Sequence, residues 1–214
     1  MVRALGKGIT AIIVDTHFIA DNQELGDRLK VVPGTEIKAS IDQPSMSAYE
    51  KEHGTQVASV MAGKNIGVAP EMKVIGVEAP LTRFGLGSKK EYEFYSGLFE
   101  WAVEERKKDP SIRIIGVSLG RISPVLEGEI ISMRTAPHVQ RYMQALGRAN
   151  DAGITVVFAA GNEGRGGSYA YGRMGDVQIL GPSIINVGAV DTGRTPLDTS
   201  DDQVAGFSSR SLSE

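Results

Sequence analysis

Three side chains in this sequence have the right types for acid–base chemistry and stand next to predicted structural elements: Asp15, His53 and Asn162. An aspartate can orient an imidazole, an imidazole can take up and return a proton near neutral pH, and a side-chain amide can donate a hydrogen bond to a developing oxyanion. Each residue alone also has a plainer interpretation, as a cap of a helix or turn for Asp15 and His53 and as a turn residue for Asn162. Taken together, they offer an orienting acid, a general base and an oxyanion donor.

Five apolar runs rich in β-branched residues predict strands that are buried on both faces of a parallel sheet. They cover residues 9–14, 72–77, 112–117, 154–159 and 184–190. Helical patterns separate them: one begins with a capping box at Ser88 and Glu91 and ends near 107–108, and another starts at Pro137 and stops at Gly153. Strands that alternate with helices predict a doubly wound α/β fold, a mostly parallel sheet with helices on both faces.

Polar or small residues close three of these strands. Asp15 ends the first, Ser118-Leu119-Gly120 ends the third, and Gly161-Asn162 ends the fourth. In an open parallel sheet the carboxyl ends of the strands lie at one edge, where ligands and catalytic groups collect. We therefore expect these residues at one edge, with His53 brought to it by a short helix that begins next to the histidine.

Three stretches outside these elements predict connections. Residues 20–52 predict a surface hairpin and loop that includes a short strand at 29–32. Residues 161–182 are rich in glycine and predict a long exposed connection of the kind that often carries binding function. Residues 191–202 predict a solvated acidic loop.

The composition predicts one globular domain over residues 1–214, because 41% hydrophobic and 23% charged residues suffice for a buried core and a solvated surface. A net charge of −3 without a dense Lys/Arg run argues against nucleic-acid and membrane-surface partners. The absence of cysteine excludes disulfides, thiolate metal sites and a cysteine nucleophile. No apolar run is long enough to span a bilayer, and we expect no signal peptide ahead of the first strand.

A series of short motifs resembles the subtilisin-like serine peptidases, or subtilases, over almost the whole chain. The matching patches, in the family's order, are Ile12-Ile13-Val14-Asp15-Thr16, His53-Gly54-Thr55 with Val57-Ala58, Gly67-Val68-Ala69-Pro70, Val117-Ser118-Leu119-Gly120, Ala159-Ala160-Gly161-Asn162-Glu163-Gly164, Ile185-Asn186-Val187-Gly188-Ala189-Val190-Asp191 and Phe207-Ser208-Ser209. Any one of these patches is a weak signal, but their order together is a strong one. The resemblance implies the three-layer α/β/α fold of that family.

The resemblance also implies a catalytic role for each matched polar residue. Asp15 would hold the His53 ring in the correct tautomer and stabilise its charged form, and His53 would deprotonate a serine. Asn162 would donate its amide to the tetrahedral oxyanion. The implied activity is hydrolysis of peptide bonds by a serine endopeptidase that needs no cofactor.

Two further patches would bind a polypeptide substrate. Ser118-Leu119-Gly120 resembles the family's substrate edge, along which an extended peptide pairs through its backbone, and Gly120 leaves room for that approach. Ala159, Ala160 and Gly161 resemble one wall of the primary specificity pocket. Small groups on that wall favour a large apolar side chain before the scissile bond.

The family's serine lies in a Gly-Thr-Ser-Met-Ala segment, and no such segment occurs in this sequence. Ser208 and Ser209 match serines of the family that are not catalytic, while Ser211 and Ser213 stand in a tail. We therefore expect a domain that is incomplete at its C-terminus, with the serine beyond residue 214 or on a complementing C-terminal segment. Without that serine the chain alone would be inactive or nearly so.

Three local departures from the family pattern also carry expectations. Asp15-Thr16-His17 replaces Asp-Ser/Thr-Gly, and His17 is either a second base or, more simply, a histidine in a surface loop. Gln56 stands where the family often has a second histidine. The connection between Gly63 and Gly67 is too short for the calcium-binding insertion of many members, so we expect no metal there.

Two other classes of function remain open. A nucleotide-binding α/β module is suggested by Gly85-Leu86-Gly87 and by Gly164-Arg165-Gly166-Gly167, although neither completes a glycine-rich fingerprint. The other class is a peptide-binding domain that has lost its chemistry. The presence of Asp15, His53 and Asn162 together argues against it, because a peptide groove needs none of the three.

Overall fold

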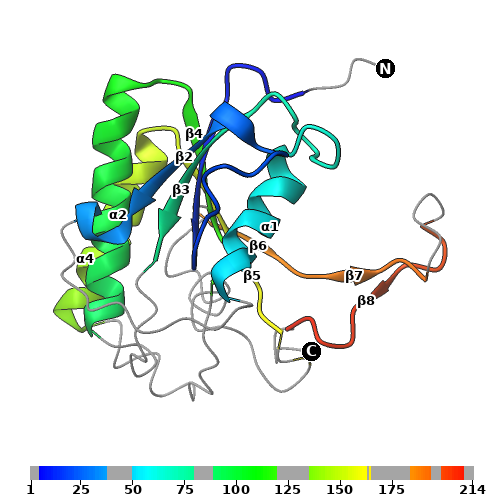
Figure 1. Cartoon of the computed structure of the whole chain (residues 1–214). Coiled ribbons are helices and arrows are strands. Elements are labelled where there is room, and N and C mark those ends of the chain that lie inside the picture. Colours follow the sequence, from blue (N-terminus) through cyan, green and yellow to red (C-terminus); the bar gives the residue numbers. More distant parts are fainter. Residues whose placement is uncertain are drawn as a thin grey trace.

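The computed structural model of the chain describes residues 5–37, 50–79, 89–119, 135–162, 164, 184–193 and 199–209. Six parallel strands form one sheet in the order β2-β3-β1-β4-β5-β6, and helices lie on both of its faces (Figure 1). The strands are β1 (Thr10–Asp15), β2 (Leu29–Pro33), β3 (Lys73–Glu78), β4 (Ile112–Val117), β5 (Thr155–Ala159) and β6 (Ile184–Val187). The predicted doubly wound α/β architecture is confirmed.

Strand β1 is buried along its whole length, as its uninterrupted apolar run predicts. It pairs in parallel with β3 on one side and with β4 on the other. Ile12 and Val14 point into one hydrophobic core, whereas Ala11 and Ile13 point into the other. Because β1 is held from both sides and both faces, the residue at its carboxyl end, Asp15, has a fixed position.

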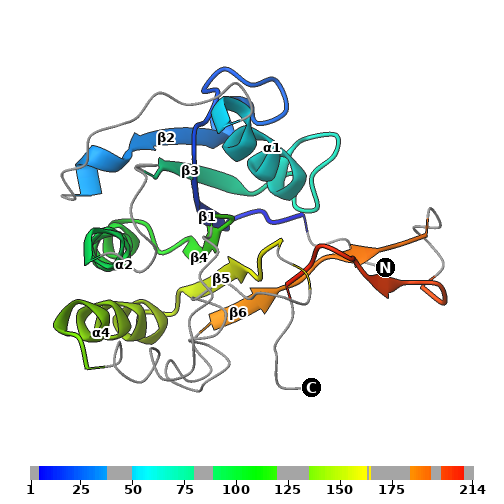
Figure 2. The ribbon, with the colours of Figure 1, turned by 90° about the horizontal axis from the view of Figure 1, so that it is seen from below.

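One face of the sheet is covered by α2 (Lys89–Lys108) and α4 (Pro137–Asp151), which pack against each other and against β4 and β5 (Figure 2). The buried aromatic side chains of the larger core lie on this face: Tyr92, Phe94, Tyr95, Phe99, Tyr142 and Phe158. Helix α4 begins at Pro137, as predicted, and Gly153 follows its end with a φ of 77°.

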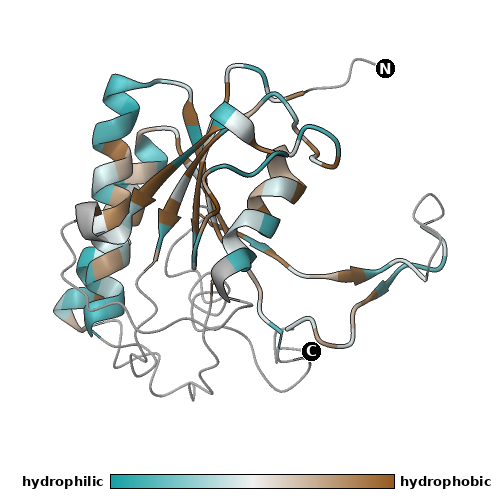
Figure 3. Cartoon of the chain, viewed as in Figure 1, coloured by the Kyte–Doolittle hydropathy of each residue, from teal (hydrophilic) through white to brown (hydrophobic). Residues whose placement is uncertain are grey.

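The opposite face is covered by α1 (Glu50–Ala62), which packs on β1 and β3. The hydrophobic residues of α1 that are fully buried in this contact are small, Ala58 and Ala62, so the helix lies close to the sheet. Over β6 this face is open, since Ile185 and Val187 are 51% and 52% exposed. Figure 3 shows largely brown, hydrophobic strands between helices that carry both hydrophilic and hydrophobic residues.

Strands β7 (Val190–Asp191) and β8 (Gln203–Val204) form an antiparallel pair that extends away from the sheet (Figures 1 and 2). The predicted run at 184–190 is therefore divided between β6 and β7, with Gly188 and Ala189 between them. Ala189 is fastened by a hydrogen bond from the Ala205 backbone N–H at 2.9 Å. The prediction of a solvated loop at 191–202 is wrong at Asp191, which belongs to β7; the other described residues of this stretch, 192–193 and 199–202, lie outside the strands and are exposed.

The prediction of a hairpin within residues 20–52 is wrong. Strand β2 lies parallel to β3 and extends the main sheet, with Leu29 and Val32 buried. Instead of reversing the chain, the Pro33-Gly34 turn signal leads into the short 3-10 helix η2 (Gly34–Ile37). Turn residues mark a change of direction but do not determine which strand will pair with the segment before them. The rest of the predicted loop, residues 38–49, lies outside the described residues.

Helix α1 begins at Glu50, three residues before the predicted start at His53. The Glu-Lys-Glu stretch at 50–52 is polar but consists of good helix formers, so its polarity was no sign of a loop. His53 thus lies within the first turn of the helix, not ahead of it. In the described part of the chain, no helix is both long and apolar enough to cross a membrane.

Candidate active site

The carboxyl ends of the parallel strands bring most of the predicted site residues to one edge of the sheet. Asp15 is the last residue of β1, Ser118 follows β4, and Ala159 is the last residue of β5. The register places Asp15 beside Glu78, the last residue of β3. This edge is where an open parallel sheet holds ligands and catalytic groups.

The structure brings Asp15 and His53 into direct contact. His53 Nδ1 donates a hydrogen bond to Asp15 Oδ1 at 2.7 Å, and the backbone N–H of Thr16 donates to the same oxygen at 2.7 Å. An ionised carboxylate only accepts hydrogen bonds, so the His53 proton is on Nδ1. The lone pair is then on Nε2, on a ring whose side chain is 25% exposed. This is the tautomer in which an imidazole can act as a base toward a group at the surface.

Burial dominates the electrostatics of Asp15. Its side chain is fully buried, and this desolvation raises its pKa; the hydrogen bonds from His53 and the Thr16 backbone oppose the rise without cancelling it. The second carboxylate oxygen, Oδ2, is buried and has no hydrogen-bond partner among the described residues. A buried charge that is incompletely satisfied destabilises the fold. Such a residue is better explained by its pairing with His53 than by the simple capping of a turn.

The two residues after His53 fix its distance from Asp15. A Cβ on Gly54 would lie 2.5 Å from the His17 carbonyl oxygen and 3.0 Å from the Asp15 Cβ, so only glycine permits this approach. Thr55 Oγ1 accepts a hydrogen bond from the Ile19 backbone N–H at 2.8 Å. The His-Gly-Thr sequence therefore provides, in order, the ring, the close contact and the tether.

Asn162 and the small residues before it lie at the end of β5, two positions from β1 in the order of the sheet. Ala160 donates its backbone N–H to the Val187 carbonyl at 2.9 Å, and the Gly161 carbonyl accepts from Ser209 N–H at 3.0 Å. Gly161 has a φ of 111°, a conformation that side chains disfavour. Asn162 is thus held on the same edge as Asp15 and His53 and has an exposed side chain.

The predicted substrate edge is described in part. Ser118 and Leu119 follow β4 and are half-buried, and Leu119 packs against the larger core. Gly120 lies outside the described residues, as do both Gly85-Leu86-Gly87 and residues 165–167 of the two glycine-rich stretches considered for nucleotide binding.

Glu78 is a residue of this edge that the sequence interpretation missed. Its carboxylate contacts His17, with 2.5 Å between Glu78 Oε1 and His17 Nδ1. The signal was present, since Glu78 ends an apolar run just as Asp15 does. His17 itself is 39% exposed, so it lies at the surface but is paired.

The described residues include no group of three or more histidine, aspartate or glutamate side chains that could hold a metal ion. In the turn between Gly63 and Gly67, the Asn65 backbone N–H and Nδ2 both donate to the carboxylate of Glu24, at 2.9 Å and 2.7 Å. These hydrogen bonds lower the pKa of Glu24. The oxygens of Glu24 are thereby engaged in closing the turn.

The sequence model of the subtilase family matches residues 6–214. A subtilisin-like protease 2 from Arthroderma otae is 28% identical over 189 residues, which cover 86% of this chain and 37% of that protein. The chain therefore spans little more than a third of the length of this curated relative.

Two solved structures have the same fold. Sphericase superposes with a TM-score of 0.61 at 20% identity, over 96% of this chain and 60% of its own. A cold-adapted subtilisin-like serine proteinase superposes with a TM-score of 0.55 at 24% identity, again over 96% of this chain and 60% of its own.

Proposed function

Because this chain belongs to the subtilase family of serine peptidases, we propose that it carries the base, the orienting acid and the oxyanion donor of a serine endopeptidase. The observation that carries the proposal is the contact of 2.7 Å between His53 Nδ1 and the buried carboxylate of Asp15. A lone surface histidine needs no buried acid behind it, whereas a general base does, because the acid fixes the tautomer and stabilises the imidazolium.

The reaction follows from this arrangement. The Nε2 atom of His53 takes the proton of a serine hydroxyl while the serine oxygen attacks the carbonyl carbon of the scissile peptide bond. Asp15 stabilises the resulting imidazolium, and the Asn162 amide donates to the oxyanion of the tetrahedral intermediate. His53 then gives the proton to the leaving amine, and water hydrolyses the acyl-enzyme by the same route.

The substrate is a polypeptide in an extended conformation. The backbone of Ser118-Leu119-Gly120 after β4, of which Gly120 lies outside the described residues, pairs with the substrate as an added strand would. Ala159, Ala160 and Gly161 form one wall of the pocket for the side chain before the scissile bond. The half-buried state of Ser118 and Ala159 supports this, because both remain accessible at the edge of the sheet.

The nucleophile in this proposal is a serine outside residues 1–214. The sequence has no Gly-Thr-Ser-Met-Ala segment, and Ser208 is buried, with its Oγ accepting a hydrogen bond from the Ala189 N–H at 2.9 Å. We assign the serine to a C-terminal segment, in the same protein or complementing it. The open apolar surface over β6, at Ile185 and Val187, is consistent with such a segment packing there.

Neither a cofactor nor calcium in the turn at residues 63–67 belongs to the proposed mechanism. Glu24 closes that turn through Asn65, so its carboxylate oxygens are already engaged, which supports the absence of calcium from this turn. Calorimetric titration with calcium should therefore give the same result for the wild type and for the Glu24→Gln variant. Tight calcium binding to the wild type that is lost in Glu24→Gln would show that this turn binds calcium after all.

A fluorophosphonate probe tests the serine, because it reacts with activated serines. We expect an adduct on the full-length gene product that contains this sequence and none on the 214-residue chain. An adduct on the intact 214-residue chain would show that the nucleophile lies within it and would overturn our placement of the serine.

The Asn162→Ala variant of the full-length product separates an enzyme from a peptide-binding domain. Peptide hydrolysis should fall by about a hundred- to a thousand-fold with little change in peptide affinity. A product that binds peptides but shows no hydrolysis, or hydrolysis unchanged by Asn162→Ala, would favour the binding domain.

A further inference from the structure

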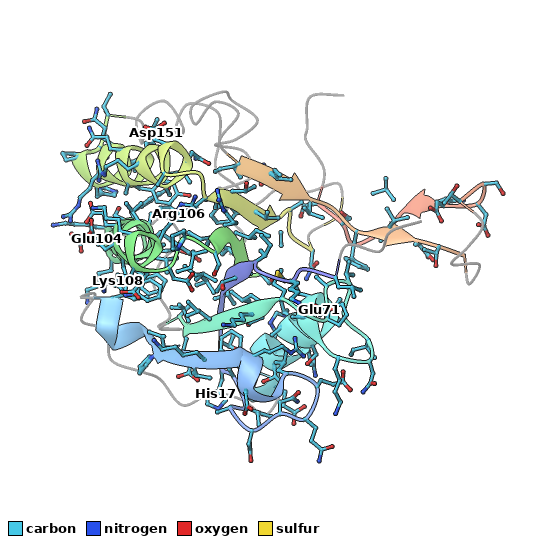
Figure 4. The ribbon with its side chains drawn as sticks, turned by 90° about the horizontal axis from the view of Figure 1, so that it is seen from above. His17, Glu71, Glu104, Arg106, Lys108 and Asp151 are labelled. Carbon is cyan, nitrogen blue, oxygen red and sulfur yellow. The ribbon has the colours of Figure 1, made fainter. Side chains whose placement is uncertain are left out.

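A second imidazole–carboxylate pair lies beside the first. His17 Nδ1 and Glu78 Oε1 are 2.5 Å apart, and their side chains are 39% and 16% exposed. Figure 4 shows His17 at the end of the sheet where β2 and α1 lie. Because the carboxylate only accepts, the proton of this contact is on His17 Nδ1, as it is in the pair formed by His53 and Asp15.

Glu78 holds two consecutive residues with one oxygen. Besides the His17 ring, Glu78 Oε1 accepts the backbone N–H of Phe18 at 3.3 Å. Glu78 ends β3 in register with Asp15 at the end of β1, and the Ala79 N–H donates to the Asp15 carbonyl at 2.7 Å. The chain leaving Asp15 is therefore fastened to the neighbouring strand at its first residues.

The same short segment, residues 15–19, carries the start of α1. Gly54 packs directly on the His17 carbonyl and on Asp15, and Thr55 accepts from Ile19. His53 immediately precedes these two contacts. A shift of residues 17 and 18 would move α1 relative to Asp15, and with it the His53 ring.

We propose that Glu78 and His17 form a positioning pair that sets the geometry of the hydrogen bond between His53 and Asp15. The pair acts through residues 17–19 and the first turn of α1, and it takes no part in proton transfer. The consequence for catalysis rests on the function proposed above, whereas the geometric effect does not.

The experiment uses the 214-residue chain and needs no peptidase activity. The sequence has three histidines, so long-range ¹H–¹⁵N spectra resolve every imidazole, with His138→Gln assisting assignment. The measured quantity is the exchange rate of the His53 Nδ1 proton with water. Glu78→Ala should speed this exchange about tenfold, the scale of one weakened charge-assisted hydrogen bond.

Two variants separate positioning from a general loss of stability. Glu104→Ala removes an ion pair of similar length, Lys107 to Glu104 at 2.6 Å on the remote surface of α2, and should leave the His53 exchange rate unchanged. Glu78→Gln keeps an acceptor oxygen and should restore most of the protection of the His53 proton. Backbone amides of β1 should exchange equally slowly in all of these variants.

The proposal would be overturned if the His53 Nδ1 proton exchanged with water as slowly in Glu78→Ala as it does in Glu104→Ala. If Glu78→Ala does not fold, as judged by circular dichroism, His17→Ala decides, because it removes the ring contact and leaves the Phe18 contact in place. Unchanged His53 exchange in His17→Ala would then overturn it. Loss of peptide hydrolysis in Asn162→Ala tests the proposed function separately, so either proposal can fail alone.

Discussion

The two faces of the sheet are covered in different ways. On one face, α2 and α4 bury a continuous cluster of large aromatic and aliphatic side chains. On the other, α1 packs through small residues over β1 and β3, while the face of β6 stays half exposed at Ile185 and Val187. The first face stabilises the fold, and the second is built for close approach, which is what a histidine aimed at a buried acid requires.

Close approach has a cost that the aromatic face does not have. A Cβ on Gly76 would lie 2.7 Å from the Phe18 ring, and a Cβ on Gly54 would lie 2.5 Å from the His17 carbonyl oxygen, so only glycine permits these contacts. Such packing buries less apolar area per residue than the cluster under α2 and α4. The α1 face also holds Asp15, whose charge is buried at the expense of stability. The comparison therefore predicts that substitutions on the two faces will have different effects.

The largest expected effect is on catalysis, from the α1 face. On the function proposed above, His53→Ala in the full-length gene product should lower the turnover of a peptide substrate by about a million-fold, the scale that subtilisin sets for loss of its histidine. Because the substitution also removes a hydrogen bond from the buried Asp15 carboxylate, circular dichroism measures the folded fraction in parallel and turnover is expressed per folded molecule. Steady-state kinetics with a chromogenic peptide measure the loss. Leu98→Ala on the other face is the control, and turnover that falls as far in this variant would remove the distinction between the faces.

The largest expected effect on stability comes from the other face. Leu98 in α2 is fully buried, so Leu98→Ala should lower the free energy of unfolding by about 2 to 5 kcal/mol through lost burial and a cavity. Urea denaturation of the 214-residue chain measures it. The matched control is Ile185→Ala on the open surface, for which we expect about 0.5 kcal/mol or less. Equal losses would mean that the surface of β6 is covered in solution.

Replacing Asp15 should have a smaller effect on the free energy of unfolding than Leu98→Ala, and in the opposite direction. Burial raises its folded pKa above the ordinary value of 3.8, so its contribution to stability is present below pH 3.8 and is lost as the pH rises through the folded pKa. Asp15→Asn should therefore gain stability relative to wild type as the pH increases over that window, while peptide hydrolysis by the full-length product falls. Urea denaturation at a series of pH values measures the difference.

Asp109 provides the control for this pH dependence. Hydrogen bonds from Ser111 lower its pKa below 3.8, so Asp109 contributes stability above that value and loses it as the pH falls through the folded pKa. Asp109→Asn should thus be less stable than wild type at neutral pH and match it in acid. If the stability of both variants relative to wild type changed in the same direction as the pH rises, the role of burial at Asp15 would be contradicted.

The smallest expected effect concerns the open surface itself. Ile185→Ser combined with Val187→Ser should reduce the binding of a hydrophobic fluorescent dye to the 214-residue chain, while the free energy of unfolding stays within about 0.5 kcal/mol. Dye titration alongside urea denaturation measures both quantities. A large loss of stability without a change in dye binding would show that these side chains already pack within the chain.

The sequence predicted the repetitive elements well, for identifiable reasons. Strand β4 was bounded correctly because Ile112 follows a Pro-Ser turn and Val117 precedes the polar Ser118, and α4 was bounded by Pro137 and Gly153. The start of α1 was placed too late because helix-forming charged residues resemble a loop in a hydrophobicity pattern. The pairing of β2 could not be predicted, because a short strand carries no record of its partner.

For the candidate site, the order of the motifs along the chain predicted which residues belong to it but not which of them are in contact. Asp15 and His53 were matched by local motifs, since each motif is a strand end or a helix start that can be recognised within a few residues. Glu78 was missed although it ends an apolar run just as Asp15 does, because its importance depends on the register of β3 with β1 and on the presence of His17 two residues after Asp15.

By itself, the sequence determined the fold class and the family, because periodicity and short motifs are local properties; it also proposed an acid, a base and an amide for the site. Only the tertiary structure decided that Asp15 is fully buried, that the His53 ring meets it at 2.7 Å, and that one face of the sheet is closed while part of the other is open. These are long-range properties. They depend on which strands become neighbours and how closely a helix can lie on them, and both are set by packing between residues far apart in the chain.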